Sequence, residues 1–301
     1  MHVIINEICR HLPVGQESRR LFHGRGHCFP GFEDLLVDWY QPHLLISLYA
    51  LRDAGWLQEL ANQLKQELPD IQSILLQERY LTNAPLRMLS GERPEVVYAV
   101  ESGLRFQLRL HQAQNIGFFL DMARGRELVK QLADGKRILN LFAYSCSFSV
   151  AALSAGAEQV VNLDMNKGAL ELGRLNHQLN KLDLRKVSFL PLEFFRSISK
   201  LKRLAPFELI VCDPPAYQGK NFKAERDWPK LLRKLPGLLA PGGEIVACLN
   251  GPHLPPEFLQ QQFKDLWPEM GLVKKFSPGD HFPEANCARG TWTFYYQDGL
   301  G

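Results

Sequence analysis

The sequence lacks several patterns that would settle a class of protein at once. No stretch of about 18 apolar residues occurs in the chain, so no membrane-spanning helix is expected. The N-terminus has no basic segment followed by a long apolar run, which argues against a secretory signal peptide. The net charge is only +3, so a polyanionic partner would have to meet a local basic surface. These absences favour a cytoplasmic protein with an ordinary hydrophobic core.

Cysteine pairs are missing as well. The six cysteines include no C-x-x-C pair and several stand in apolar surroundings, which predicts buried, reduced thiols rather than a disulfide framework. His23, His27 and Cys28 lie close together, but a zinc site needs four ligands and the second half of such a site is absent. We therefore expect no metal.

The hydrophobic pattern changes near residue 113. Residues 1–16 read as an N-terminal extension and residues 17–112 as a small α+β domain. That domain would recognise substrate or serve as a rigid lid or dimer surface. Its features are two apolar stretches separated by "QP", a one-faced helix over residues 54–68, a strand "SILLQER" and a hairpin that turns at "SG".

Residues 113–301 alternate between strand and helix patterns. Continuous apolar strands alternating with helices predict an α/β domain with a mainly parallel sheet covered on both faces. Ligands bind such sheets at the carboxyl ends of the strands. The expected strands are 137–142, 160–164, 187–192, 207–213, 244–250 and 290–297, and the expected helices are 148–156, 166–182, 227–240 and 256–267.

Characteristic residues follow the first three of these strands. The loop 143–147 contains no glycine, so the G-x-G-x-x-G fingerprint is absent and an NAD enzyme is the weakest alternative. Asp164 ends the second strand, where a carboxylate binds ribose hydroxyls; capping of the next helix is the alternative. Glu193 follows the third strand and could accept a hydrogen bond from an adenine amino group, with Phe194 or Phe195 against the ring. A surface glutamate beside two core aromatics is the alternative there.

The fourth strand ends in the sharpest motif, "CDPPAYQGKNF". Asp213 follows a run of apolar residues, and Pro214 and Pro215 then force an extended, rigid turn. Tyr217 offers a stacking face for a base taken out of its helix. A simple strand-to-loop turn is the alternative, but the position after a strand-end acid favours a substrate site.

A basic segment, residues 220–234, comes next. It has a net charge of +4 and predicts contact with a phosphate backbone, although a solvated helix face explains the charges equally well. Aromatic residues interleaved with the charges favour nucleic acid. The cations are Lys220, Lys223, Arg226, Lys230, Arg233 and Lys234, and the aromatics are Tyr217, Phe222 and Trp228.

With these residues assembled, the chain resembles a class I S-adenosylmethionine-dependent methyltransferase. It is most similar to the bacterial 23S ribosomal RNA methyltransferases that modify cytosine C5 or guanine. The resemblance extends from "RRLFHGRGHCFPGFEDLLVDWY" through "NIGFFLDMARGR", which is similar to a G-x-F-x-D-x-R-x-x-R segment, and "ILNLFAYSCSFSVAALSAGA" to "DPPAYQGKNF". It implies a Rossmann-like domain with a mainly parallel seven-stranded sheet and S-adenosylmethionine as cofactor.

The resemblance also implies residue roles. Asp164 would hold the ribose of the cofactor and Glu193 its adenine, with Met165 and Phe194 beside these two acids. The cofactor would be bordered by Phe119, Asp121 and Arg124. Its methionine end would be lined by Asn140, Phe142, Ala143, Tyr144 and Ser145. Asp213 and the two prolines would position the target base near the methyl group.

Two departures from the family pattern matter. Longer members begin with an RNA-binding PUA domain, and here the resemblance starts near residue 17. Transfer to cytosine C5 also needs a thiolate that attacks C6, which the family places just after the strand that follows "GG". Cys248 falls inside that strand and Asn250 takes the more exposed position. The sequence does not decide whether Cys248 is an inert buried residue or a nucleophile. Asn250 suits a hydrogen bond to an exocyclic amine or a guanine edge.

The favoured hypothesis is a methyltransferase for a base of ribosomal RNA, contacted through residues 220–234. A methyltransferase for a protein or small molecule is the first alternative, and a non-catalytic RNA- or ribosome-binding protein is the second. A homodimer is left open.

Overall fold

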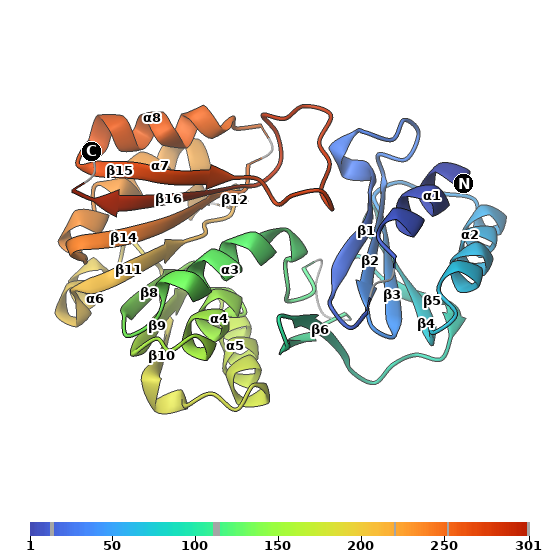
Figure 1. Ribbon diagram of the computed structural model, residues 1–301, viewed down its shortest axis with the longest axis horizontal. Helices are drawn as coiled ribbons and strands as arrows, with labels where there is room; N and C mark the ends of the chain where they lie inside the picture. Colours follow the sequence, from blue (N-terminus) through green and yellow to red (C-terminus); the bar gives the residue numbers. More distant parts are fainter. Residues whose placement is uncertain (13–14, 111–114, 220, 252, 300–301) are drawn as a thin grey trace. The chain divides into compact units, whose positions relative to one another are not determined.

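The computed structural model describes residues 1–12, 15–110, 115–219, 221–251 and 253–299. The chain forms two compact units, Met1–Leu120 with Asp280–Asn286, and Asp121–Gly279 with Cys287–Gly301 (Figure 1). The boundary expected at residues 112–113 and the cation Lys220 lie outside the described residues. Within the described ranges, no helix is long and apolar enough to cross a membrane, and no group of three or more His, Cys, Asp or Glu side chains could hold a metal ion.

The first unit is built on a five-stranded sheet with the order β1-β2-β3-β4-β5. Only β3 and β4 pair in parallel; the other neighbours are antiparallel. Helices α1 and α2 share one hydrophobic core with this sheet. The elements are α1 (His2–Arg10), β1 (Arg19–His23), β2 (Leu35–Tyr40), β3 (His43–Leu48), α2 (Ala54–Glu67), β4 (Ser73–Glu78), β5 (Leu86–Gly91) and the hairpin β6 (Val97–Glu101) and β7 (Leu104–Leu108).

The local signals in this unit were sufficient to predict its central elements. The strand pair, the helix, the strand at 73 and the hairpin are all confirmed. Asp53 caps α2 by accepting a hydrogen bond from Trp56 N at 2.8 Å, and the hairpin turn is left-handed at both Ser102 and Gly103. Helix α1 lies in the expected extension, and its Ile4 and Ile8 are fully buried in the core.

Residues 280–286 pack on the first unit although they lie far along the chain. Ala285 N donates to the Gly26 carbonyl at 2.7 Å, and a ring nitrogen of His281 is 2.9 Å from the Arg20 carbonyl. A side chain at Gly26 would place its Cβ 1.7 Å from the Pro283 oxygen, so the close approach depends on glycine there. No local pattern in the sequence predicts this return of the chain.

The second unit contains a seven-stranded sheet with the order β10-β9-β8-β11-β14-β16-β15. Its elements are α3 (Ala123–Leu132), β8 (Arg137–Leu141), α4 (Ser147–Ser154), β9 (Gln159–Asp164), α5 (Lys167–Leu179), β10 (Val187–Pro191), α6 (Ile198–Leu204), β11 (Phe207–Cys212), the short pair β12 (Tyr217–Gln218) and β13 (Phe222–Lys223), α7 (Ala224–Leu232), β14 (Leu239–Leu249), α8 (Pro256–Leu266), β15 (Met270–Phe276) and β16 (Trp292–Asp298).

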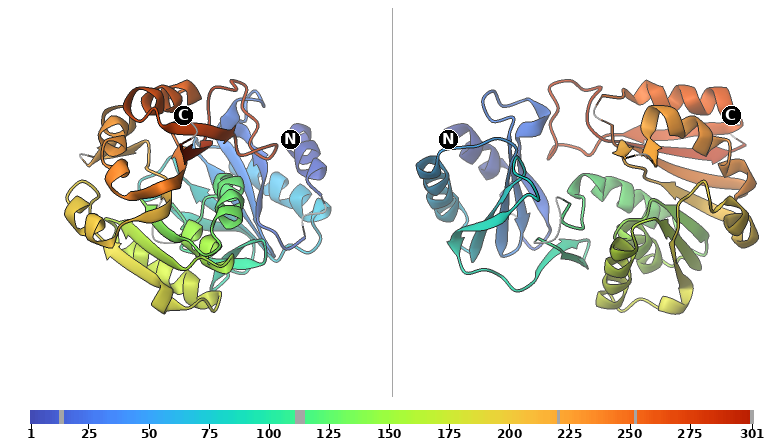
Figure 2. Two further views of the ribbon diagram at one scale, coloured as in Figure 1. Left: turned by 60° about the vertical axis from the view of Figure 1, so that its left-hand side comes forward. Right: turned by 180° about the vertical axis from the view of Figure 1, so that it is seen from behind.

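This sheet confirms the expected fold class. Six strands run in the same direction, and β16 is inserted antiparallel between β14 and β15. One face packs against α3 and α4, and the other against α6, α7 and α8 (Figure 2). Because both faces are covered, the parallel strands are apolar along their whole length, which is the pattern that the sequence shows.

Two details of the sequence prediction are wrong. The helix expected over 227–240 is instead α7, a 3-10 turn at Leu235–Gly237 and the start of β14. Pro236 and the "PGG" at 241–243 end the helical pattern early, and β14 bulges before it resumes its pairing with β11 at Glu244. Strand β15 was not expected, because its exposed lysines break the alternation of apolar residues.

Candidate active site

Five strands of the second unit end at the same edge of the sheet. The parallel pairing of β10, β9, β8, β11 and β14 brings their carboxyl ends together. The residues at those ends are the loop 142–146, Asp164, Glu193, Asp213 and Asn250. Open parallel sheets bind their ligands at this edge, so it is the candidate site of the chain.

The loop after β8 has an unusual backbone. Phe142, Tyr144 and Cys146 all have positive φ angles, of 57°, 46° and 60°, although none is glycine. Each such residue costs about 1–2 kcal/mol, so tertiary contacts must hold the loop in place. Ala143 N donates to the Leu163 carbonyl at 3.0 Å, and Cys146 N donates to the Ala143 carbonyl at 2.7 Å. The sequence gives no signal for this conformation, because no glycine marks it.

Asp164 joins the loop to the next strand. Its carboxylate accepts hydrogen bonds from Tyr144 N at 2.8 Å and Asn166 N at 2.7 Å. Burial raises the pKa of Asp164, and these two backbone bonds oppose the rise. Asn166, not Asp164, caps α5, since its side chain accepts from Ala169 N. Helix capping therefore does not explain the acid at the end of β9.

A small, open pocket lies beside Asp164. Its walls are mostly apolar, with a carboxylate from each of two neighbouring strand ends. This combination suits a nucleoside, because flat apolar walls receive the base and the carboxylates accept from hydroxyl and amino groups. The lining residues are Phe142, Leu163, Asp164, Met165, Leu192, Glu193, Phe194, Gln218, Asn221 and Phe222.

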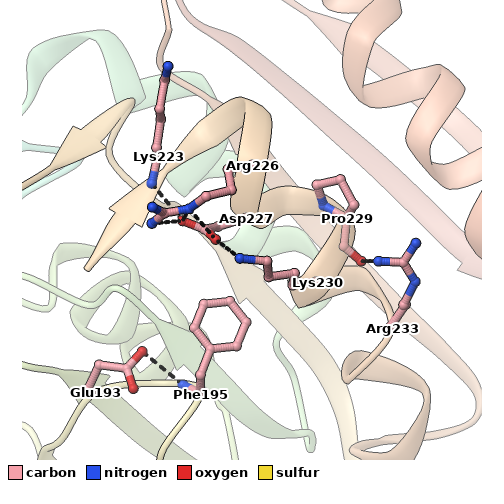
Figure 3. A network of polar contacts seen from close by, with 8 residues as sticks. All are labelled: Glu193, Phe195, Lys223, Arg226, Asp227, Pro229, Lys230 and Arg233. Atoms are coloured by element: carbon pink, nitrogen blue, oxygen red, sulfur yellow. Dashed lines mark hydrogen bonds and ion pairs between the residues drawn. The ribbon is translucent and has the colours of Figure 1, made fainter. Parts of the chain in front are cut away.

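Glu193 is held rigidly at the rim of this pocket. Its carboxylate accepts from Phe195 N at 3.0 Å, as Figure 3 shows, and from Arg196 N at 2.9 Å. Phe194 is buried and lines the pocket, whereas Phe195 is not among the lining residues. Phe222 also lines the pocket, and the sequence analysis assigned it no role in cofactor binding. Its position after the Asp-Pro-Pro turn was the available signal.

Asp213 lies on the turn that follows β11. Asn250 reaches it from the end of β14, and its Nδ2 donates to Asp213 Oδ1 at 2.7 Å and to the Pro214 carbonyl at 3.1 Å. Burial raises the pKa of Asp213 to about 6, and the charge of Asp121 adds to the rise. The hydrogen bonds from Asn250 and from the Cys248 thiol and the charge of Arg126 oppose it. The turn thus presents an ionisable carboxylate and a carbonyl, both oriented by one amide.

A sequence profile of the S-adenosylmethionine-dependent methyltransferase family matches residues 19–297. The chain belongs to this family. The predicted cofactor, S-adenosylmethionine, and the predicted class of enzyme are thereby confirmed. The apolar walls of the pocket and its two carboxylates are chemically suited to the adenosine part of this cofactor.

Several relatives are named for ribosomal RNA. YwbD of Bacillus subtilis strain 168, named as a candidate ribosomal RNA large subunit methyltransferase, is 28% identical over 289 residues, which are 89% of this chain and 72% of YwbD. A ribosomal RNA large subunit methyltransferase of Deinococcus radiodurans is 30% identical over 81% of this chain and 62% of its own length. Ribosomal RNA large subunit methyltransferase I of Yersinia pseudotuberculosis is 25% identical, covering 83% and 65%. The chain spans less than two thirds of the last two.

Solved structures agree on the fold. SMU.776, solved as a complex with SAH, superposes with a TM-score of 0.87 at 22% identity, covering 98% of this chain and 81% of that one. A SAM-dependent methyltransferase from Agrobacterium tumefaciens gives a TM-score of 0.66 at 16% identity, covering 88% and 87%. At these identities the likeness concerns the architecture alone.

Residues of α3 and the turn before it lie near the Asp213 turn of the methyltransferase. Asp121 accepts a hydrogen bond from Thr291 Oγ1 at 3.0 Å, and its charge acts on Asp213. Arg124 is exposed and donates to the Ser277 carbonyl at 2.8 Å. Arg126 is the buried arginine, and sequence reasoning missed it; the available signal was its place five residues after Asp121, where the family motif ends in arginine. Phe119 belongs to the first unit and stays a prediction.

A chain of buried polar side chains begins at Asn140, just before the loop 142–146. Asn140 Nδ2 donates to Asn162 Oδ1 at 2.8 Å, and Asn162 Nδ2 donates to Ser149 Oγ at 3.0 Å. Ser149 is in turn bonded to His177, whose pKa burial lowers to about 4, so that the imidazole is neutral at physiological pH. Asn140 Oδ1 is buried and has no partner among the described residues, and a bound donor group would satisfy it.

Helix α5 packs directly behind the same loop. A Cβ at Gly173 would lie 2.4 Å from Cys146 Sγ and 3.3 Å from the carbonyl carbon of Ser145. Asn176 of the same helix donates to the Ser145 carbonyl at 3.1 Å. The loop 142–146 therefore rests on a helix surface that has room only for glycine at position 173.

We expect Gly173→Ala to displace this loop and to weaken binding of S-adenosylhomocysteine by about 10-fold, because overpacking typically introduces about 1–3 kcal/mol of strain. Isothermal titration measures the affinity. Glu171→Ala, on the exposed side of the same helix, is the control and should bind normally. Unchanged affinity in both variants would show that the loop tolerates the displacement.

The basic segment is less available than the sequence indicated. Asp227 is buried and accepts from Lys223 N, from the Arg226 guanidinium and from the Lys230 ammonium (Figure 3). Burial alone would raise the pKa of Asp227, but these bonds hold it at about 2. Phe222 and Trp228 are core residues, so the expectation that these aromatics lie among the charges on a nucleic-acid-binding surface is wrong. Tyr217 alone of the three is exposed, at 69%.

Proposed function

We propose that this methyltransferase transfers the methyl group of S-adenosylmethionine to a base of ribosomal RNA. The observation that carries the proposal is the Asp213 turn, where two oriented acceptors are followed in the chain by Tyr217, whose side chain is exposed. An unstacked base can lie against an aromatic face while its polar edge is bound. The names of the relatives support ribosomal RNA as the substrate class. A cytoplasmic location is part of this proposal.

The distribution of charge supports a polyanionic substrate at the second unit. That unit carries 24 Lys and Arg residues against 17 Asp and Glu, whereas the first unit carries 11 against 15. A modest total charge therefore conceals a basic catalytic unit and an acidic N-terminal unit. Phosphate contacts supply most of the sequence-independent affinity for RNA, so the second unit is the better candidate for the contact surface.

In the proposed mechanism, each strand end has one task. Asp164 would hold the ribose hydroxyls and Glu193 the adenine amino group, while the left-handed loop would receive the methionine end. The bound cofactor supplies an electrophilic methyl group. The protein aligns the acceptor with that group, which accounts for most of the rate enhancement in a reaction of this kind. Asp213 and the Pro214 carbonyl would fix the base in that alignment.

The test is transfer of tritiated methyl groups from S-adenosylmethionine to RNA and protein from a strain that lacks this gene. We expect label in ribosomal RNA that ribonuclease releases and protease does not. Label in protein alone, or in low-molecular-mass material alone, would overturn the assignment to RNA. An Asp213→Ala sample provides the background.

Two cations of the basic segment remain candidates for RNA contact. Lys223 and Lys234 are exposed and form no ion pair among the described residues, in contrast to Arg226 and Lys230. We expect Lys223→Glu with Lys234→Glu to weaken RNA binding about 10-fold at low salt and to reduce its salt dependence. Filter binding at several salt concentrations measures both effects. Arg185→Glu, elsewhere on the second unit, is the control; equal losses in both proteins would argue for nonspecific charge alone.

A further inference from the structure

The chemistry of the acceptor atom decides which groups the site must contain. Carbon 5 of a pyrimidine is not nucleophilic, so its methylation requires a thiolate that first bonds to C6. That thiolate must be exposed to the base and must ionise readily. A nitrogen atom with its own lone pair needs no such adduct. The cysteines around the Asp213 turn therefore distinguish the two reactions.

Cys248 does not meet the requirements for a nucleophile. It lies inside β14, where it pairs with Thr293 of β16, and it is fully buried among residues such as Val129 and Phe148. Burial raises its thiol pKa well above the ordinary value, and the charge of Asp213, to which the thiol forms a hydrogen bond, raises it further. A protonated thiol sealed within a strand cannot attack a base.

The two other buried cysteines offer no substitute. Cys146 and Cys212 are fully buried, and burial raises both thiol pKa values well above the ordinary value. Cys9 and Cys28 belong to the first unit and also have raised pKa values. Cys287 is exposed, in the connection between β15 and β16, and the trapping experiment below therefore includes it. At the end of β14 itself, where a base would meet the Asp213 turn, the chain has Asn250.

Asn250 shows what the turn is built to receive. One NH₂ group donates to two acceptors, Asp213 Oδ1 at 2.7 Å and the Pro214 carbonyl at 3.1 Å. These acceptors are therefore fixed at positions where they bind nitrogen-bound hydrogens. Base edges carry such hydrogens on exocyclic amines and on some ring nitrogens. The site is thus complementary to the nitrogen-bearing edge of a base.

We propose that the methyl acceptor is a nitrogen atom of the base, that no covalent adduct between enzyme and base forms, and that Asn250 is a positioning residue that orients the acceptors. This inference rests on the proposed function. The nitrogen lone pair forms the new bond to the methyl carbon as the bond between that carbon and sulfur breaks, and its electron pair stays with sulfur. An exocyclic amine then loses one proton to Asp213 or water, whereas a ring nitrogen that carries no hydrogen loses none. Asp213 has a pKa of about 6, so it is mostly ionised at neutral pH and able to accept.

The identity of the methylated nucleoside is the first test. Ribosomal RNA from a strain that lacks this gene is methylated by the wild-type enzyme, digested to nucleosides and separated by mass spectrometry. Any nucleoside with a new methyl group on nitrogen supports the inference, and its fragments distinguish an exocyclic amine from a ring atom. 5-Methylcytidine, 5-methyluridine or a 2′-O-methyl nucleoside would overturn the inference that nitrogen is the acceptor, while the proposed function as an RNA methyltransferase would stand. No methylation of RNA would instead remove the proposed function.

A trapping experiment tests the absence of an adduct in the unmodified enzyme. Ribosomal RNA transcribed with 5-fluorocytidine captures enzymes that attack C6, since the fluorine blocks release after methyl transfer. We expect no complex that survives a denaturing gel. A stable complex that disappears in Cys248→Ser or Cys287→Ser would identify the nucleophile and overturn the proposal.

The positioning role of Asn250 is tested by its pH profile. Its hydrogen bond lowers the pKa of Asp213, so Asn250→Ala should move the acidic limb of activity to higher pH. We also expect the turnover number to fall about 10-fold with a smaller change in KM for RNA, because the acceptors lose their orientation. A loss of activity with an unmoved pH profile would indicate a merely structural role. Binding of S-adenosylhomocysteine should be normal and shows that the variant is folded.

Discussion

Replacing Asp213 with alanine should reduce methyl transfer by about 100- to 1000-fold and leave affinity for S-adenosylhomocysteine within about 3-fold, as expected when an electrostatic group in an active site is lost. The carboxylate lies on the turn after β11, where Asn250 orients it, and Asp213 is not among the residues that line the pocket suited to adenosine. Its loss removes the acceptor that would align the base. Single-turnover kinetics and isothermal titration separate the two effects.

Asp213→Asn is the sharper variant, because it keeps the size of the side chain. An amide oxygen still accepts from Asn250, but the negative charge is gone. We expect the rate of methyl transfer to fall, as in Asp213→Ala. The fall should be smaller than in Asp213→Ala if the orientation of the base matters more than the negative charge. Normal turnover in both variants would remove Asp213 from the mechanism.

The pKa of about 6 gives this prediction a pH dependence. Because the ionised carboxylate is the competent form, wild-type activity should fall as the pH drops through about 6. Burial has raised the pKa above its ordinary value, so this limb lies at higher pH than an exposed aspartate would give. The acidic limb should be absent from the residual activity of Asp213→Asn. A wild-type rate that stays constant from pH 7 to 5 would contradict the assignment.

Asp164→Ala should weaken binding of S-adenosylhomocysteine by about 100-fold or more, since hydrogen bonds to a charged group each contribute about 1.5–3 kcal/mol. Two effects combine here. The ribose would lose its acceptor, and Tyr144 N and Asn166 N would lose the carboxylate that holds them at 2.8 and 2.7 Å. The loop with three left-handed residues would then lose one of its restraints.

The control for this variant is Asp183→Asn. Asp183 is an exposed aspartate of the same unit that caps a short 3-10 turn and pairs with Arg185. It should bind S-adenosylhomocysteine normally. Circular dichroism of both variants establishes that they are folded, and wild-type affinity in folded Asp164→Ala would show that the ribose is held elsewhere.

Patterns that act over a few residues were readable in the sequence. Apolar strand runs predicted the parallel sheet, and strand-end positions selected Asp164 and Asp213, because parallel strands all end at one edge. The Asp-Pro-Pro turn was visible for the same reason, since proline restricts the backbone locally. The family resemblance added the cofactor, which the glycine-poor loop alone left undecided.

Other features depend on contacts between residues that are distant in the sequence. Phe222 and Trp228 alternate with lysines and arginines as surface aromatics do, yet the sheet buries both. Arg226 and Lys230 read as free cations, but Asp227 pairs with them from a buried position. Such pairings cannot be derived from residue types, because the same charges on an exposed helix would be solvated.

The sequence by itself determined the methyltransferase fold, the cofactor and the strand-end acids, because each follows from a local pattern or a family motif. Only the tertiary structure decided three further points: the left-handed backbone of the loop 142–146, the burial of Cys248 and the bond from Asn250 to Asp213. Each depends on how β14, β11 and α5 pack around the turn. The physical reason is that burial and orientation are properties of neighbours in space, and they set the ionisation and the reach of every group in the site.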